Sequence, residues 1–438
     1  MTQANFYNGA VSIGIQPAED PNNGKAQGIF RLQRSVDAKT QTRSSARVNR
    51  YDRDVTRSNY HILTNTAVSR ILFKGNTAVG VDFVDVKSSI NGAVKAKKEV
   101  IVAAGAVHTP QILQLSGVGD AAYLKTFGIK PVVDLPGVGQ NLQDHLVLKV
   151  NYNCRQSTLI VVLSGNADRT TDTSNHFPNG GSLQSNATYA AEQRALYDSG
   201  KPSAYDLTGT TGNLMIQLPL SNWTANSSSI IRMAEVQDPA KLLGGRPDPR
   251  VLRGFTKQRE AIIKNINTAV VGGVSWNTGP ETSIYMTRPF SRGSIKLNST
   301  SILNAPLIDY GALTDSTDLE ILYAIYMKNR ELMSTPDVSI LGPIETAPTP
   351  GTNDTKAIKE AIKKALAPSN AHQCCTTAMM SRENGGVVDP QNRVYGTNRL
   401  SVVDASIWPL VVGGGPQASV YAGAEKAADV IKARHSLQ

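Results

Sequence analysis

Apolar and polar positions alternate with a period of two through the first part of the chain, which predicts β-strands. The expected strands are Tyr60–Thr64, Ala67–Phe73, Ala78–Val86 and Val94–Ala103. Asn91-Gly92 predicts the turn of a hairpin, with Val94–Ala103 as its return strand. The run VIVAAGA, Val100–Ala106, is apolar throughout and predicts a fully buried strand. Thr109 and Pro110 then fit the N-cap and the first residue of a helix.

The pattern changes between about residues 150 and 366, where apolar runs lie farther apart. The strands expected there are Leu214–Leu220, Ser229–Ala234, Thr268–Ser275, Thr282–Thr287 and Gly293–Leu297. Asp315–Ser334 has the period of an amphipathic helix, and Lys356–Ala367 predicts a surface helix. Strands followed by a helix indicate an antiparallel sheet backed by helices. Met1–Gln41, in contrast, is expected to consist mainly of loops.

The C-terminal segment from Ala371 to Gln438 combines a strand, glycines and a helix. A strand-like run, Ser401–Ser406, precedes the elbow Gly413–Gly415, and a helix is expected from about Gln417 to Ala433. This order places free N–H groups and a positive dipole end together, which suits a phosphate, an enolate or a flavin carbonyl. Asp404 at the strand end is placed to accept from a ribityl or ribose hydroxyl. The same pattern also fits an elbow that only closes a sheet.

Composition limits the classes of function. The 438 residues suffice for two domains, and the net charge of +10 is scattered without aromatic interleaving, so no nucleic-acid partner is expected. No apolar run could cross a membrane, and Met1–Gly9 lacks the form of a signal peptide, which leaves the compartment open. The oligomeric state stays open as well. Of three cysteines, Cys374 and Cys375 are adjacent, a spacing that rarely bridges and does not match a metal site.

Two long segments resemble a known family. HQCCTTAMMSRENGGVVDPQNRVYGTNRLSVVDASIWP, which begins at His372, and GAVHTPQILQLSGVG, Gly105–Gly119, are similar to signatures of the glucose–methanol–choline (GMC) family of FAD-dependent oxidoreductases. The resemblance implies an α/β fold (α+β overall), with a doubly wound FAD-binding domain and an antiparallel-sheet substrate domain. The implied ranges are 1–150 for the first part of the FAD-binding domain, 151–366 for the substrate domain, and 367–438 for the C-terminal part.

The resemblance also implies a reaction. Family members oxidise an alcohol by hydride transfer to flavin, while a histidine takes the hydroxyl proton and a second His or Asn assists. His372 matches the first histidine and is therefore the expected base for a small-molecule alcohol substrate. The second position falls on Gly415, which has no side chain, and no compensating residue is visible nearby in the sequence.

The same alignment implies a set of FAD contacts. The positions are Val68, Ala104, Gly105, Asn141, Asp404, Ala405, Pro416 and Gln417. The segment GVGQNLQDH, Gly137–His145, matches the part that turns over the flavin, so Asn141 and His145 are candidate polar contacts there. A capped loop with a satisfied histidine explains this segment equally well.

One family feature is missing from this sequence. No G-x-G-x-x-G turn for the FAD pyrophosphate occurs in it, and the family's first signature is absent too. We therefore expect an N-terminally shortened form of a longer enzyme, or another group that fills the gap. We also expect that the chain alone does not retain FAD. An alternative is a flavin-independent cyclase or isomerase, or a catalytically silent relative, on the same scaffold.

Overall fold

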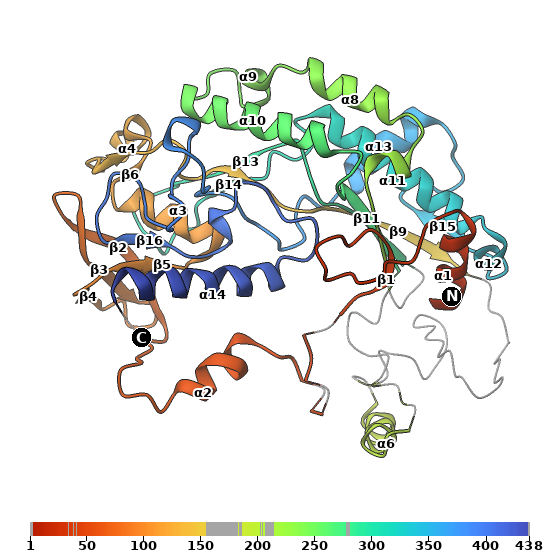
Figure 1. The fold of residues 1–438 in the computed structure, drawn as a ribbon, viewed down its shortest axis with the longest axis horizontal. Coiled ribbons are helices and arrows are strands. Elements are labelled where there is room, and N and C mark those ends of the chain that lie inside the picture. Colours follow the sequence, from red (N-terminus) through yellow and green to blue (C-terminus); the bar gives the residue numbers. More distant parts are fainter. Residues whose placement is uncertain are drawn as a thin grey trace.

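The computed structural model describes residues 3–33, 35–37, 39–40, 42–154, 183, 186–201, 203, 205, 214–276 and 281–436. Figure 1 shows an antiparallel sheet with helices α8, α10, α11 and α13 above and beside it, and a second group of elements around β5, β16, α3 and α14. This mixed architecture confirms the predicted α/β (α+β) class.

The largest sheet has six strands in the order β1-β10-β11-β12-β9-β15, and every neighbouring pair is antiparallel. Its strands are β1 (Gly28–Arg31), β10 (Leu214–Leu218), β11 (Gly272–Trp276), β12 (Glu281–Met286), β9 (Leu146–Asn153) and β15 (Ile344–Ala347). The predicted antiparallel sheet is thus present, with β10, β11 and β12 close to their expected positions.

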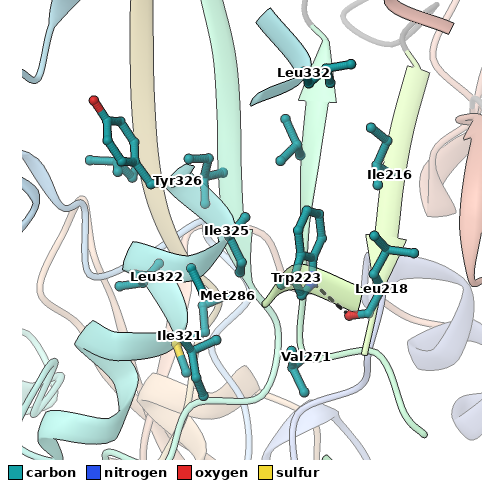
Figure 2. Packing of buried hydrophobic residues seen from close by; sticks show 14 of the residues in the cluster. Ile216, Leu218, Trp223, Val271, Met286, Ile321, Leu322, Ile325, Tyr326 and Leu332 are labelled. Carbon is teal, nitrogen blue, oxygen red and sulfur yellow. Dashed lines mark hydrogen bonds between the residues drawn. The ribbon is translucent and has the colours of Figure 1, made fainter. Parts of the chain in front are cut away.

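Helices cover this sheet and form the largest apolar core with it. They are α1 (Gln3–Ser12), α7 (Leu220–Trp223), α8 (Ser227–Val236), α10 (Pro249–Asn265), α11 (Ser316–Met333), α12 (Pro336–Ser339) and α13 (Thr355–Ala365), while the short α9 (Pro239–Leu242) lies outside this core. Figure 2 shows Ile321 and Ile325 of α11 in this core, and Trp223 donating its indole N–H to the carbonyl of Leu218 at 2.9 Å. Full burial of such side chains contributes about 1.5–3 kcal/mol each.

Two parts of this core differ from expectation. Ser229–Ala234 is not a strand but part of α8, because Ile230 and Ala234, four residues apart, both face the core. The expected loop near the N-terminus contains α1, whose Phe6 packs on Trp276 with ring centroids 5.7 Å apart. Both α1 and β1 join the six-stranded sheet and its core.

The second group of elements contains a parallel pair and a three-stranded antiparallel sheet. The pair is β5 (Val100–Val102) with β16 (Leu400–Val402), and the sheet is β2 (Thr66–Lys74), β3 (Thr77–Asp85) and β4 (Asn91–Lys95). Asn91 lies opposite Val84 inside β4, so the predicted turn at Asn91-Gly92 is wrong and the chain turns before it. The side chain of Ile101 is 46% exposed, so the prediction of a fully buried strand is also wrong. Among the described strands, only β16 pairs with β5.

Short elements complete the described chain. They are η1 (Arg47–Tyr51), α2 (Asp52–Asp54), α3 (Gly105–Leu115), β6 (Val118–Gly119), α4 (Ala121–Thr126), β7 (Val133–Asp134), β8 (Gln140–Leu142), α6 (Ala187–Asp198), β13 (Gly293–Lys296), β14 (Leu307–Asp309), η3 (Arg382–Asn384), η4 (Ala405–Ile407) and α14 (Gln417–Arg434). The expected helix after the glycine elbow is confirmed as α14, which begins at Gln417.

Helix α3 begins earlier than predicted, and its proline explains how it contacts the C-terminal segment. Thr109 and Pro110 lie inside the helix instead of at its start. Pro110 has no N–H to donate to the carbonyl of Ala106, four residues back. That carbonyl accepts instead from the hydroxyl of Thr376 at 2.6 Å. The freed helical acceptor thus ties α3 to the loop that follows His372.

This contact predicts the effect of Thr376→Val. Valine keeps the shape but removes the hydroxyl, so the carbonyl of Ala106 loses its partner in a fully buried place. We expect the free energy of unfolding to fall by about 1–3 kcal/mol in urea titrations. The matched control is Thr126→Val, which removes an exposed hydroxyl bonded to the carbonyl of Tyr123 and should change stability by at most about 0.5 kcal/mol. Equal effects of the two substitutions would contradict the proposed tie.

Candidate active site

Two segments far apart in the sequence run antiparallel and bring two histidines together. Cys374 pairs with Gln143, and Ala367 pairs with Val147, through backbone bridges. The loop between residues 367 and 374 therefore lies along the segment that connects β8 to β9. His372 comes from this loop, and His145 comes from the facing segment.

The buried carboxylate of Asp144 fixes the loop. The side chain is 4% exposed and accepts from the backbone N–H groups of Asn370 and His372, both at 3.1 Å. It also accepts from the hydroxyl of Ser369 at 2.6 Å and from the N–H of His145 at 2.7 Å. Because several donors converge on one carboxylate, the backbone at His372 has a defined position before any ligand binds.

Three side chains of the same segment form hydrogen bonds with residues 409–412, which precede the glycine elbow. Asn141 and Gln143 donate to the carbonyl of Pro409 at 3.2 Å, and Gln143 also accepts from the N–H of Val411. His145 bonds the carbonyl of Val412 through Nε2 at 2.9 Å. These three side chains thus all bond the 409–412 segment, whereas Asp144 bonds the loop of His372.

The two imidazoles are in direct contact. Nδ1 of His372 lies 3.0 Å from Nδ1 of His145, and the rings are nearly perpendicular, with centroids 4.9 Å apart. His145 is 2% exposed, whereas His372 is half-buried. Burial lowers the pKa of His145 to about 4, and the neighbouring His372 adds to this effect. Burial also lowers the pKa of His372, opposed by the charge of Asp144, so both rings are neutral at pH 7.

The structure places a second histidine beside His372, although not at Gly415. Gly415 itself is exposed and has no side chain, as expected, and a Cβ added there would meet nothing within 4 Å. The second histidine is His145, which contacts His372 directly. In the sequence, His145 is marked only by the polar residues Asn141, Gln143 and Asp144 that precede it, and these do not indicate its partner.

Asn141, which the resemblance implies as a cofactor contact, bonds other residues of the chain through its side chain. Its amide donates to the carbonyls of Cys375 and Pro409, and its oxygen accepts from Nε of Arg292 at 2.9 Å. Its side chain therefore joins elements inside the protein, because both ends of the amide already have protein partners. A side-chain contact to a cofactor would have to replace one of these bonds.

Several predicted cofactor positions meet where α3 begins and β16 ends. The carboxylate of Asp404 accepts from the N–H of Gly105 at 3.0 Å, from the hydroxyl of Thr109 at 2.6 Å, and from the N–H of Ser406 at 2.8 Å. Ala104 is exposed, and Ala405 is half-buried beside it. Asp404 retains acceptor capacity, since a carboxylate offers about four lone pairs.

The start of α14 and β2 supply the remaining cofactor positions. Pro416 precedes α14 without a side-chain cap, so the first N–H groups of a long helix are available to an anion. Gln417 is exposed, and its side-chain oxygen accepts from the hydroxyl of Ser35. Val68 is half-buried in β2. The residues present fit one side of a dinucleotide such as FAD.

The adjacent cysteines also differ from expectation. Cys374 and Cys375 form a disulfide, whereas the sequence predicted no bridge between them. The expectation rested on the rarity of bridges between adjacent cysteines, and here Cys375 has a φ of 80°, in the left-handed region. Both cysteines are fully buried beside the loop of His372.

Among the described residues, no cluster of three or more His, Cys, Asp or Glu side chains is suited to a metal ion. None of the helices in the described ranges has the length and apolar character needed to span a membrane.

Comparison with known proteins defines the class as an oxidoreductase. Two family models described as GMC oxidoreductase match residues 1–147 and 289–424. Dehydrogenase xptC of Emericella nidulans is 42% identical over 434 residues, which cover 98% of this chain and 67% of that protein. An FAD-dependent oxidoreductase from Chaetomium thermophilum has a TM-score of 0.90 at 42% identity, covering 99% of this chain and 72% of that one. A fungal aryl-alcohol oxidase has a TM-score of 0.87 at 29% identity, covering 99% and 71%.

The chain belongs to the GMC oxidoreductase family. It spans about two thirds of the length of the first curated relatives that it matches. FAD is the cofactor that this membership implies, in agreement with the resemblance seen in the sequence.

Burial of His145 predicts a pH dependence of stability. Its pKa is about 4 in the folded protein and about 6.5 when unfolded, so the unfolded chain binds more protons between these values. The contribution of His145 to the free energy of unfolding is therefore fully present above pH 6.5. It is lost as the pH falls towards 4, by up to about 3 kcal/mol.

The test compares the native chain with His145→Gln by urea unfolding at pH 7.5, 6, 5 and 4. Glutamine does not titrate, so the native chain should lose more stability than the variant as the pH falls. His372, Asp144 and Arg288, the other charged or titratable groups that act on His145, are present in both proteins. Parallel curves would show that His145 is not the buried neutral group described here.

Proposed function

We propose that this protein oxidises an alcohol by hydride transfer to FAD, with His372 as the base. The observation that carries the proposal is the neutral, half-buried imidazole of His372, held by Asp144 beside the segment that leads to the glycine elbow. A neutral imidazole can take the proton of the alcohol hydroxyl while hydride leaves the carbon that bears this hydroxyl. The similarity to a fungal aryl-alcohol oxidase supports an alcohol as the substrate class.

Residues of the six-stranded sheet reach the elbow and would form the opposite wall of the substrate site. Gln217 of β10 donates to the carbonyl of Gly413 at 3.2 Å. Arg288 follows β12 and donates to the carbonyl of Val270 at 2.9 Å, and its charge acts on His145. A positive charge on this side favours the negative charge that develops on an alcohol oxygen as its proton leaves.

FAD supplies the hydride acceptor when it is bound. The groups of this chain that would hold it are the N-terminus of α14 at Pro416 and Gln417, the α3 turn at Ala104 and Gly105, and the Asp404-Ala405 pair. The helix N-terminus suits an anionic phosphate or a ring carbonyl, and Asp404 suits a hydroxyl. These groups orient the cofactor from one side only.

His372→Ala tests the base. We expect turnover to be lost while the free energy of unfolding changes by at most about 1 kcal/mol, because the side chain is half-buried and its backbone is held by Asp144. The assay uses excess FAD, a dye acceptor, and a panel that includes benzyl alcohol, choline and a secondary alcohol. His61→Ala, at an exposed position, is the matched control. Equal turnover by native and His372→Ala protein on an accepted alcohol would refute the assignment.

A separate prediction concerns cofactor affinity: the 438-residue chain alone should not retain FAD through desalting. The groups at α14, at the α3 turn and at Asp404 would contact FAD from one side only, and charge-assisted hydrogen bonds to a pyrophosphate are worth about 1.5–3 kcal/mol each. The measurement is the absorbance spectrum after incubation with excess FAD and removal of the free cofactor. A stoichiometric flavin band would contradict the prediction and directly support the oxidoreductase proposal.

A further inference from the structure

We propose that His145 is a positioning residue that fixes the tautomer of His372, so that Nε2 of His372 is the atom that receives the substrate proton. This inference rests on the proposed function for its catalytic meaning. The geometric part concerns only the two imidazoles and the backbone around them. The sequence alone indicated no contact between His145 and His372.

The contact of His145 with Val412 shows which nitrogen of His145 carries the proton. This nitrogen lies 2.9 Å from the carbonyl oxygen of Val412, and a carbonyl can only accept a hydrogen bond. Nε2 of His145 must therefore carry a hydrogen. The carbonyl is held in place because the 409–412 segment is also bonded by Gln143 and Gln258.

The other ring nitrogen of His145, Nδ1, then has a lone pair and accepts a hydrogen bond. A neutral imidazole has one N–H, so Nδ1 of His145 is an acceptor. It lies 3.0 Å from Nδ1 of His372, which must then donate. The opposite arrangement would need a doubly protonated His145 in a place that is 2% exposed, where burial lowers its pKa to about 4. Arg288 also disfavours that charge, as does a protonated His372.

Asn370 is the other neighbour of the same nitrogen. Its Nδ2 lies 3.4 Å from Nδ1 of His372, compared with 3.0 Å for the contact with His145. The longer separation lies outside the usual range of 2.7–3.2 Å, whereas the contact with His145 lies inside it. The histidine contact therefore decides the tautomer.

The consequence is a free lone pair on Nε2 of His372. Because Nδ1 donates to the buried His145, the other side of the half-buried ring presents its unprotonated nitrogen. In the proposed reaction the alcohol O–H proton goes to this Nε2 and the carbon loses its hydride to FAD, which leaves a carbonyl. The resulting imidazolium keeps its Nδ1–H bond to His145, so the ring need not rotate.

The direct test is nitrogen NMR of the chain labelled with ¹⁵N-histidine, at pH 7.5 and without FAD. The chain has six histidines, and His372→Gln and His145→Phe assign the two signals. We expect His372 with a protonated Nδ1 and a bare Nε2, and His145 with the reverse. A protonated Nε2 on His372 would overturn the inference. This measurement needs neither cofactor nor turnover, so its outcome is independent of whether the chain oxidises alcohols.

A pair of variants separates positioning from packing. His145→Phe keeps a ring but offers no acceptor, whereas His145→Asn keeps an acceptor near the position of Nδ1. With excess FAD and an accepted alcohol, we expect kcat of the Phe variant to fall about tenfold or more, because part of a general-base contribution of about 10²–10⁴ is lost. KM should change little, and the Asn variant should recover part of kcat and the His372 tautomer. Equal loss in both variants with an unchanged tautomer would mean that His145 only fills space.

Discussion

The structure of the site depends on one buried carboxylate. Asp144 is 4% exposed and accepts hydrogen bonds from Ser369, Asn370 and His372 as well as from its neighbour His145. A buried carboxylate without such donors would carry a large desolvation penalty, so the loop must close around it when the protein folds. The same closure places the ring of His372 against His145. The position of the proposed base thus follows from the need to satisfy a buried charge.

The side chains around Asp144 contact two different parts of the C-terminal segment. Asn141, Gln143 and His145 bond the 409–412 segment, while Asp144 bonds the loop of His372. This segment continues directly into β9 of the six-stranded sheet. The site is therefore assembled where the packed sheet meets the C-terminal segment, and the apolar core behind β9 supports it against local opening.

Local patterns in the sequence were sufficient for much of the fold but not for pairings across it. Strand β3 was predicted from its alternation, β12 from its apolar run, and α14 from the glycines that precede it. The strand expected at Ser229–Ala234 failed because a short apolar run fits both periods, and only burial against the core selects the helix. His372 was recognised from its motif. Its contact with His145 spans 227 positions, so no local pattern could reveal it.

The two histidines also explain how this site differs from the arrangement that the family resemblance implied. A side chain at Gly415 would stand in open space at the elbow, where it could touch a substrate. His145 is buried and its Nε2 is occupied by the carbonyl of Val412, so in the proposed reaction it would act on the substrate only through His372. The second histidine therefore cannot replace the missing group atom for atom. In the proposed reaction, His145 would provide a hydrogen-bonding constraint that orients His372 as a single base, and Arg288 would stabilise negative charge on the alcohol oxygen.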